Sequence, residues 1–224
     1  MGRPFTASDE QILQAAGKVI ARRGPDDFTL AEVAEEVGLS RAAIILRFKS
    51  THALKVTLLT QMVERFARAL EVLPTSPGGN NVLRLAAFIG RYAGTRESSA
   101  RFFAGFTSNL RNRELLELER KRGEALREAI SRVMPRVSIE HESAIIAFRT
   151  HLTGTIMAWL SADEVDSRAY MVMRTREWLK LAGVAFDEAV VRELTAEESG
   201  SSEGKKSAVG STRARPPRAR KRVA

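Results

Sequence analysis

Apolar residues in this chain recur at intervals of three and four, which is the period of an amphipathic helix. The first such stretch follows Ser8, a good helix cap, with Gln11 three residues later. Gly24 and Pro25 then follow, and both residue types end helices. We therefore predict a first helix between these signals. Its apolar stripe comprises Ile12, Leu13, Ala16, Val19 and Ile20.

Two short helices follow, each with its own start signal. Thr29 opens the first, which ends at Gly38, and Ser40 opens the second, predicted over Arg41–Phe48. Two helices this short, joined by a tight turn and preceded by a longer helix, form the helix-turn-helix pattern. An ordinary helical hairpin within a bundle is the alternative interpretation.

A long helix is predicted over residues 51–73, and the segment Pro74–Asn81 is the clearest internal boundary. Its aligned apolar positions are Leu54, Leu58, Met62, Phe66 and Leu70. Further helices are predicted at 81–94, 98–109, 112–133, 139–161 and 165–183, with one more short helix within 186–198. The predicted fold is all-α. An N-terminal three-helix helix-turn-helix domain (1–50) is joined by the long helix to a helical C-terminal domain (51–198).

Charge is concentrated at the C-terminus. The 224 residues carry a formal net charge of +9, and residues 201–224 hold eight basic residues against one acid. This segment has no hydrophobic period, so it cannot bury enough apolar surface to offset its ordering entropy. We predict a disordered basic tail over 199–224. Whether the tail contacts DNA or is simply solvated stays open.

The residue inventory favours a binding protein over an enzyme. The absence of Cys excludes a disulfide framework and a Cys nucleophile, and it suits a cytoplasmic location. His52, His141 and His151 show no metal-binding spacing, and no nucleophile-elbow, dinucleotide or phosphate-loop motif is present. No run of about 18 apolar residues occurs, so no membrane association is expected. We expect no cofactor and no metal.

One set of residues within Ile12–Leu54 follows a recurrent pattern: Ala15, Ala16, Gly24, Thr29, Val33, Ala34, Gly38, Leu39, Ser40, Ile44, Phe48 and Leu54. In spacing and residue type this set resembles the DNA-binding domain of the TetR family of transcriptional regulators. The resemblance implies a repressor that binds a palindromic DNA operator as a homodimer and is released by a small, largely apolar effector. The alternative is a nonspecific architectural DNA-binding protein that uses the basic tail.

The third helix would be the recognition helix. Its N-terminal residues, Arg41 and Ala42, are placed to meet base edges in the major groove. Arg can bind guanine O6 and N7, and Ala can contact a thymine methyl group. Candidates for phosphate contact are the basic residues near its end and the N-termini of the two short helices: Arg47, Lys49, Thr29 and Ser40. A solvated charged face is the alternative for the basic side chains.

Two positions depart from the family pattern. The family usually has Tyr at the position of Ile45 and Lys at the position of Thr51, and both commonly contact DNA phosphates. Ile45 cannot donate a hydrogen bond, and Thr51 offers a hydroxyl group without a charge. Either these phosphate contacts are lost, or Ile45 and the adjacent Leu46 pack on thymine methyl groups.

The resemblance also implies that the C-terminal helices form a dimer and enclose a small-molecule pocket. The candidate ligand-binding residues are Phe88, Tyr92, Phe102, Phe103, Phe106, Phe148 and His151. Plain core packing is the alternative for each of them. The last two long helices are more apolar than one chain can easily hide, so two from each protomer can form a four-helix bundle.

Overall fold

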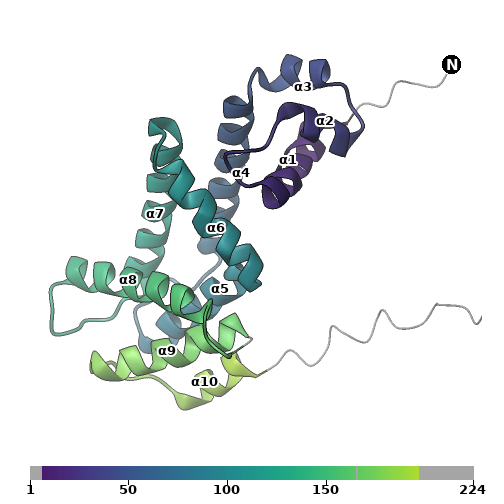
Figure 1. Cartoon of the computed structure of the whole chain (residues 1–224). Helices are drawn as coiled ribbons and strands as arrows, with labels where there is room; N and C mark the ends of the chain where they lie inside the picture. The colour runs from purple at the N-terminus through teal and green to yellow at the C-terminus, as the bar shows by residue number, and fades with distance from the viewer. Residues whose placement is uncertain (1–6, 165, 197–224) are drawn as a thin grey trace, which may run out of the picture.

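The computed structural model of the chain describes residues 7–164 and 166–196 (Figure 1). These residues form ten helices and no strand, which confirms the predicted all-α fold. The helices are α1 (Asp9–Arg23), α2 (Leu30–Val37), α3 (Arg41–Phe48), α4 (Thr51–Glu71), α5 (Gly79–Ala93), α6 (Arg96–Asn109), α7 (Arg113–Val133), α8 (His141–Trp159), α9 (Ser167–Leu181) and α10 (Glu188–Thr195). The basic tail predicted at 199–224 lies outside the described residues.

The N-terminal helices begin at the predicted caps. Ser8 and Thr29 each form a capping box, with Gln11 and Glu32 respectively, and the Ser40 hydroxyl caps α3. These helices and the first turns of α4 surround a small apolar core, whose fully buried members include Ile12, Val19, Val33, Ile44 and Leu54. Figure 1 shows this unit at one end of the molecule. The helix-turn-helix arrangement is thus confirmed.

The long helix α4 connects this core to a second one. Leu54 belongs to the first core, whereas Phe66 and Leu70 belong to the second. The predicted apolar stripe is wrong in its middle, because Met62 is 42% exposed. Leu59 and Val63 are buried there instead, since α7 packs along that side of α4 and contributes Leu115.

The second core is built around α5, which packs against α9 most extensively. The two helices approach closely at Gly90, whose carbonyl oxygen accepts a 2.9 Å hydrogen bond from the Ser167 hydroxyl. A Cβ atom on Gly90 would lie 2.7 Å from the Cα atom of Arg168, so no larger residue fits without moving α9. This contact fixes α5 and α9 as the rigid centre of the C-terminal half.

The apolar surplus of α8 and α9 is smaller than the sequence suggests. Several large apolar side chains of these helices are buried within the protomer: Ile145, Leu152, Trp159, Met171 and Leu179. The exposed ones are Ile146, Met157, Met173 and Leu181, the last residue of α9. Among the described helices, none combines the length and apolarity needed to cross a membrane.

Candidate DNA-binding surface and ligand site

The turn between α2 and α3 presents α3 to solvent. Gly38 ends α2 in the left-handed conformation (φ 70°, ψ 29°), which Gly adopts without steric cost. Ser40 then starts α3, and Ile44 and Phe48 anchor this helix in the N-terminal core. The opposite face of α3 is exposed. It carries the residues predicted to read DNA.

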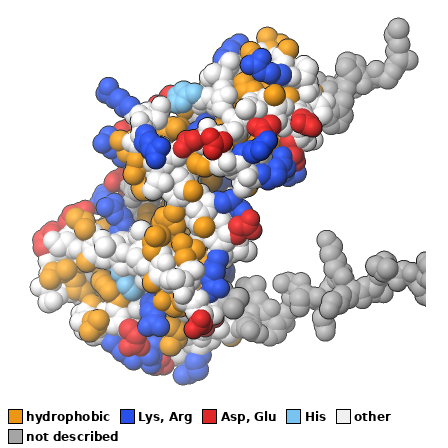
Figure 2. All heavy atoms as spheres, viewed as in Figure 1, with side chains coloured by type: hydrophobic (Ala, Val, Ile, Leu, Met, Phe, Trp, Pro, Cys, Tyr) orange, Lys and Arg blue, Asp and Glu red, His pale blue; other side chains and the backbone are white. Residues whose placement is uncertain are grey.

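Two basic residues at the two ends of α3 are distinguished by their lack of an acidic partner. Within described residues 7–55, Arg41 and Lys49 are the Lys and Arg side chains without an ion pair. The remaining ones are paired: Lys18 and Arg22 with Glu36, Arg23 with Glu32, Arg47 with Asp9, and Lys55 with Asp26. Uncompensated positive charge in this domain is therefore concentrated on α3. Figure 2 shows basic and hydrophobic side chains next to one another at this end of the molecule.

Leu46 is the large apolar residue that α3 exposes. It is 75% exposed, whereas Ile45 is half-buried and packs against the N-terminal core. A spacing of four places the exposed Ala42 and Leu46 on one face of the helix. The apolar residue available to a DNA base is therefore Leu46 more than Ile45. Sequence reasoning had put Ile45 first, although the burial of Ile44 and Phe48 already sets which face is outward.

Arg47 is engaged within the protein. Its guanidinium donates a 2.5 Å hydrogen bond to the carbonyl oxygen of Ala7 and lies 3.4 Å from the Asp9 carboxylate. These contacts tie the end of α3 to the start of α1. Arg47 has to leave them to reach a phosphate directly.

The two helix N-termini predicted to bind phosphate differ in charge. At α2, Glu32 accepts hydrogen bonds from the backbone and hydroxyl of Thr29. A hydrogen bond from Arg23 is the largest cause that holds the pKa of Glu32 below its ordinary value, so a negative charge occupies this end. The first turn of α3 after Ser40 contains no acid. The α3 terminus is thus the better phosphate site, since a carboxylate repels phosphate.

The junction between α3 and α4 has an unusual backbone. Lys49 has φ 66° and ψ −49°, a region that non-glycine residues rarely adopt, and the Ser50 N–H donates to the Phe48 carbonyl oxygen at 2.7 Å. This tight turn directs Lys49 outward and brings Thr51 to the first position of α4, where it is half-buried. Strain of this kind is found more often at functional sites than elsewhere.

Five of the seven predicted ligand residues lie in two neighbouring aromatic groups. Tyr92 contacts the rings of Phe66 and Phe88, with centroids 4.8 and 6.0 Å away. Phe102 contacts Phe103 and Phe106 in the same way, at 5.3 and 6.4 Å. Tyr92 and Phe102 are both partly exposed, although each is a large apolar ring. Rings from α4, α5 and α6 therefore form two partly exposed aromatic groups.

A buried polar cluster adjoins these rings. The Arg122 guanidinium on α7 lies 4.4 Å from the centroid of Phe102 and forms an ion pair with Glu119. Glu119 also accepts a 2.8 Å hydrogen bond from the Asn109 side chain, at the end of α6. The sequence analysis missed this cluster, because α7 is rich in charges that look solvated. Steps of four and three from the buried Leu115 to Glu119 and Arg122 are the signal that could have found it.

The other two ligand candidates lie elsewhere. The Phe148 ring packs on the rings of His151 and Trp178, between α8 and α9. The His151 Nε2 atom lies 3.3 Å from the Thr175 hydroxyl oxygen, and burial lowers the pKa of His151. These residues form part of the α8–α9 packing and are not brought together with the other five.

Polar contacts link the N-terminal domain to α6 and α7. The Ser108 hydroxyl on α6 donates to the Asp26 carboxylate at 2.5 Å, and the Lys55 ammonium donates to Ser108 at 2.8 Å. The Ser108 hydrogen bond is the largest cause that lowers the pKa of Asp26. His52 on α4 lies 2.8 Å from the Glu114 carboxylate on α7. A displacement of α6 would therefore act directly on the DNA-binding domain.

An open groove of about 830 Å³ lies at the other end of the molecule, between the start of α5 and the α9–α10 loop. Gly79, Arg84, Asp187 and Glu188 are among the residues that line it. None of the predicted ligand residues borders this groove. We therefore place the candidate ligand site at the aromatic groups and Arg122.

Comparisons with known proteins agree with this geometry. Residues 12–55 match the family model "Bacterial regulatory proteins, tetR family". No match is found among curated proteins. A TetR transcription regulator from Haloarcula marismortui has a similar structure, with 17% identity, 78% of this chain and 97% of that chain covered, and a TM-score of 0.66.

Two further solved structures are similar over most of their length. A transcriptional regulator from Rhodococcus sp. Rha1 shows 17% identity, with 80% of this chain and 100% of that chain covered and a TM-score of 0.66. The multidrug binding protein EbrR, solved with malachite green, shows 19% identity, with 77% and 98% covered and a TM-score of 0.61.

The fold and the exposed recognition helix define a helix-turn-helix DNA-binding protein. The family match identifies the chain more narrowly as a TetR-type DNA-binding transcriptional regulator. The proteins that this model describes are bacterial regulatory proteins.

Proposed function

We propose that this protein represses transcription from the cytoplasm as a homodimer bound to a palindromic operator. A small, largely apolar ligand between α4, α5, α6 and α7 releases it. One observation carries the DNA-binding part of the proposal. The two Lys and Arg side chains of described residues 7–55 without an acidic partner are Arg41, the first residue of α3, and Lys49, the C-cap residue of the same helix. A cytoplasmic location follows from the role, because a bacterial regulator works where the DNA is.

Each exposed residue of α3 has a proposed role at the DNA. Arg41, at the helix N-terminus, binds a guanine edge, while Ala42 and Leu46 meet thymine methyl groups. Lys49 binds phosphate, as does the N-terminus of α3 at Ser40. The secondary candidates are Thr29, Ile45, Arg47 and Thr51. The Thr29 hydroxyl is hydrogen-bonded to Glu32 and the Arg47 guanidinium to the Ala7 carbonyl, while the other two side chains are half-buried.

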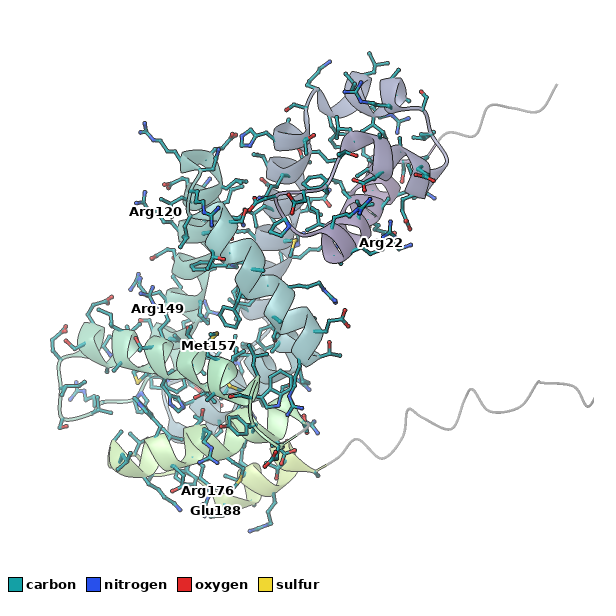
Figure 3. All side chains as sticks on the ribbon, in the orientation of Figure 1. Arg22, Arg120, Arg149, Met157, Arg176 and Glu188 are labelled. Atoms are coloured by element: carbon teal, nitrogen blue, oxygen red, sulfur yellow. The ribbon has the colours of Figure 1, made fainter. Side chains whose placement is uncertain are left out.

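The exposed apolar face of α8 and α9 supports the dimer. Ile146 and Met157 on α8 are about half exposed, as is Met173 on α9 (Met157 is labelled in Figure 3). Pairing these helices with those of a second copy would bury this face in a four-helix bundle. Sedimentation equilibrium should give about twice the chain mass of 24.8 kDa. Met157→Glu should shift the measured mass toward that of a monomer, while Val72→Glu, at the exposed apolar position directly after α4, should not.

The aromatic rings around Tyr92 and Phe102 support the ligand site. The similar multidrug binding protein EbrR was solved in complex with malachite green. By analogy, we propose that this chain binds a compound of drug-like size against its own rings. The hydrogen bonds from Ser108 and Lys55 would transmit a movement of α6 to the N-terminal domain.

Selection of bound DNA from a random pool tests the proposal. A sequence-specific regulator enriches a palindrome, whereas an architectural protein that uses the basic tail retains no common sequence. Arg41→Ala should relax the preference at one position of each half-site, at a cost of about 1–3 kcal/mol. Lys18→Ala, on the exposed side of α1, is the matched control and should leave the preference unchanged. Deletion of residues 201–224 should reduce only the salt-dependent part of the affinity for DNA and should leave the preferred DNA sequence unchanged.

A further inference from the structure

We propose that the ligand is an aromatic anion, such as an aromatic carboxylate, whose acidic group binds the Arg122 guanidinium while its ring packs against Tyr92 and Phe102. This inference rests on the proposed ligand site between α4 and α7 and adds the chemical class of the ligand. At this site the Arg122 guanidinium remains available to a ligand, whereas the Glu119 carboxylate is already enclosed by its partners.

Arg122 has unused hydrogen-bonding capacity. Its side chain is only 13% exposed, and among the described residues its hydrogen-bond partner is Glu119 alone. A guanidinium has five N–H donors in a planar fork, so one carboxylate partner leaves several of them for a ligand. Burial lowers the pKa of Arg122 to about 10, so the group is still cationic at neutral pH. A buried cation with spare donors favours a ligand that brings acceptors and negative charge.

Glu119, by contrast, is not available to a cationic ligand. Its side chain is 2% exposed, and both carboxylate oxygens are engaged, Oε1 by the Asn109 amide and Oε2 by Arg122. A cationic ligand would have to break these hydrogen bonds and would then face the positive charge of Arg122. The charge at this site therefore selects against cations.

Tyr92 adds a second positive neighbour and a polar group. Partial burial raises the pKa of its hydroxyl, while the charges of Arg122 and Arg65 act in the opposite direction. Both arginines therefore lie within electrostatic range of the Tyr92 ring, and one of them, Arg65, is on α4. Arg65 is already paired with Glu10 at 3.2 Å, so an anion placed beside Tyr92 would interact mainly with Arg122 and could accept a hydrogen bond from the hydroxyl.

The rings define the other half of the ligand. Phe102 already stacks with the Arg122 guanidinium at 4.4 Å, and it is 38% exposed. Tyr92 is similarly exposed beside Phe66 and Phe88. A planar ring would cover these faces, and an acidic substituent on that ring would then lie close to Arg122. A long aliphatic acid would use the charge but would leave the ring faces without stacking partners.

Three naphthalene probes that differ only in charge test this inference by calorimetric titration of the full chain. They are 2-naphthoate (anionic), 2-naphthylmethanol (neutral) and 2-naphthylmethylammonium (cationic). The naphthoate should bind at least about tenfold more tightly than the ammonium compound, with the alcohol between them. Because all three probes carry the same ring, differences between their affinities report the effect of charge and not that of stacking.

Variants then locate the bound charge. Arg122→Gln leaves Glu119 buried without its partner and can unfold the protein, so Glu119→Gln/Arg122→Gln replaces the pair by two neutral amides. This double variant should bind naphthoate no more tightly than naphthylmethanol. Arg120→Gln is the matched control, because Arg120 is on the same helix but is 67% exposed and directed to solvent (Figure 3). It should retain the full preference for the anion.

The outcomes separate this inference from the proposed function. The proposal of an anionic ligand would be overturned if the ammonium compound bound more tightly than naphthoate. It would also be overturned if the double variant bound naphthoate as tightly as the unaltered protein does. Failure of all three probes to bind at about 1 mM would overturn it as well. In each case, enrichment of a palindrome in the DNA selection would leave operator binding intact. Loss of that enrichment would instead reject the proposed function.

Discussion

Replacement of the exposed Leu46 by Ala separates DNA contact from folding on one short helix. The change removes three carbon atoms, each worth about 0.8 kcal/mol when fully transferred out of water. Because Leu46 is 75% exposed, roughly 1.8 kcal/mol is available to DNA in each half-site. Two half-sites then give about 3.6 kcal/mol, or roughly a 400-fold weaker operator affinity. This value is an upper bound, since it assumes complete burial against the bases.

The control for this prediction is Ile44→Ala, two residues away. Ile44 is fully buried in the N-terminal core, so its truncation should cost about 2–5 kcal/mol of unfolding free energy. Leu46→Ala should change that free energy by less than about 0.5 kcal/mol.

Fluorescence anisotropy with the selected operator, run beside urea unfolding, measures both quantities. Replacing thymine by uracil in the operator removes the methyl groups and should reproduce the loss in the unaltered protein. Unchanged operator affinity of Leu46→Ala would refute the proposed methyl contact.

Four further substitutions test the structure. Gly90→Ala should destabilise the protein by about 2–3 kcal/mol, because the added Cβ atom meets the α9 backbone. Gly105→Ala on α6 has free space around the added Cβ atom and should stabilise the protein by about 0.5–1 kcal/mol. Thermal unfolding of the two variants measures both effects. Lys49→Gly should raise the unfolding free energy by about 1 kcal/mol, since Gly tolerates φ 66°, and should still weaken operator binding in the anisotropy assay. Asp26→Asn removes a carboxylate whose pKa the Ser108 hydrogen bond lowers below 3.8. The stabilisation by the Asp26 carboxylate is complete above pH 3.8 and is lost as the pH falls through the lowered pKa. Urea unfolding should therefore show a difference in unfolding free energy between Asp26→Asn and the unaltered protein of less than about 1 kcal/mol at neutral pH, and this difference should vanish in acid.

The starts of the first three helices could be predicted from the side chains that cap them. Ser8, Thr29 and Ser40 all start helices as expected, since each supplies an oxygen to free backbone N–H groups. The start of α6 was placed two residues late, because its capping box pairs Thr95 with Ser98 in place of Glu or Gln. The start of α5 was also late, since its N-cap is a Gly without a side-chain signal.

The candidate site could be predicted only in part. Sequence reasoning found the rings around Tyr92 and Phe102, because large aromatic residues are few in this chain. It could not separate them from Phe148 and His151, since helical periodicity marks an inward face without saying which helix lies opposite. Contacts between α6 and α7, such as that from Asn109 to Glu119, depend on how the helices cross.

The way α6 is attached has a consequence for the heat of the regulatory transition. Its fully buried residues are all polar, namely Ser99, Ser108 and Asn109. Hydrogen bonds hold both ends, including those from Arg96 to the carbonyl oxygens of Ala162 and Glu164. Water can replace such bonds at a modest free-energy cost, and shifting the helix exposes little new apolar surface. The movement of α6 should therefore contribute a heat-capacity change close to zero to the transition, whereas unfolding of the α5 core would contribute a large positive one.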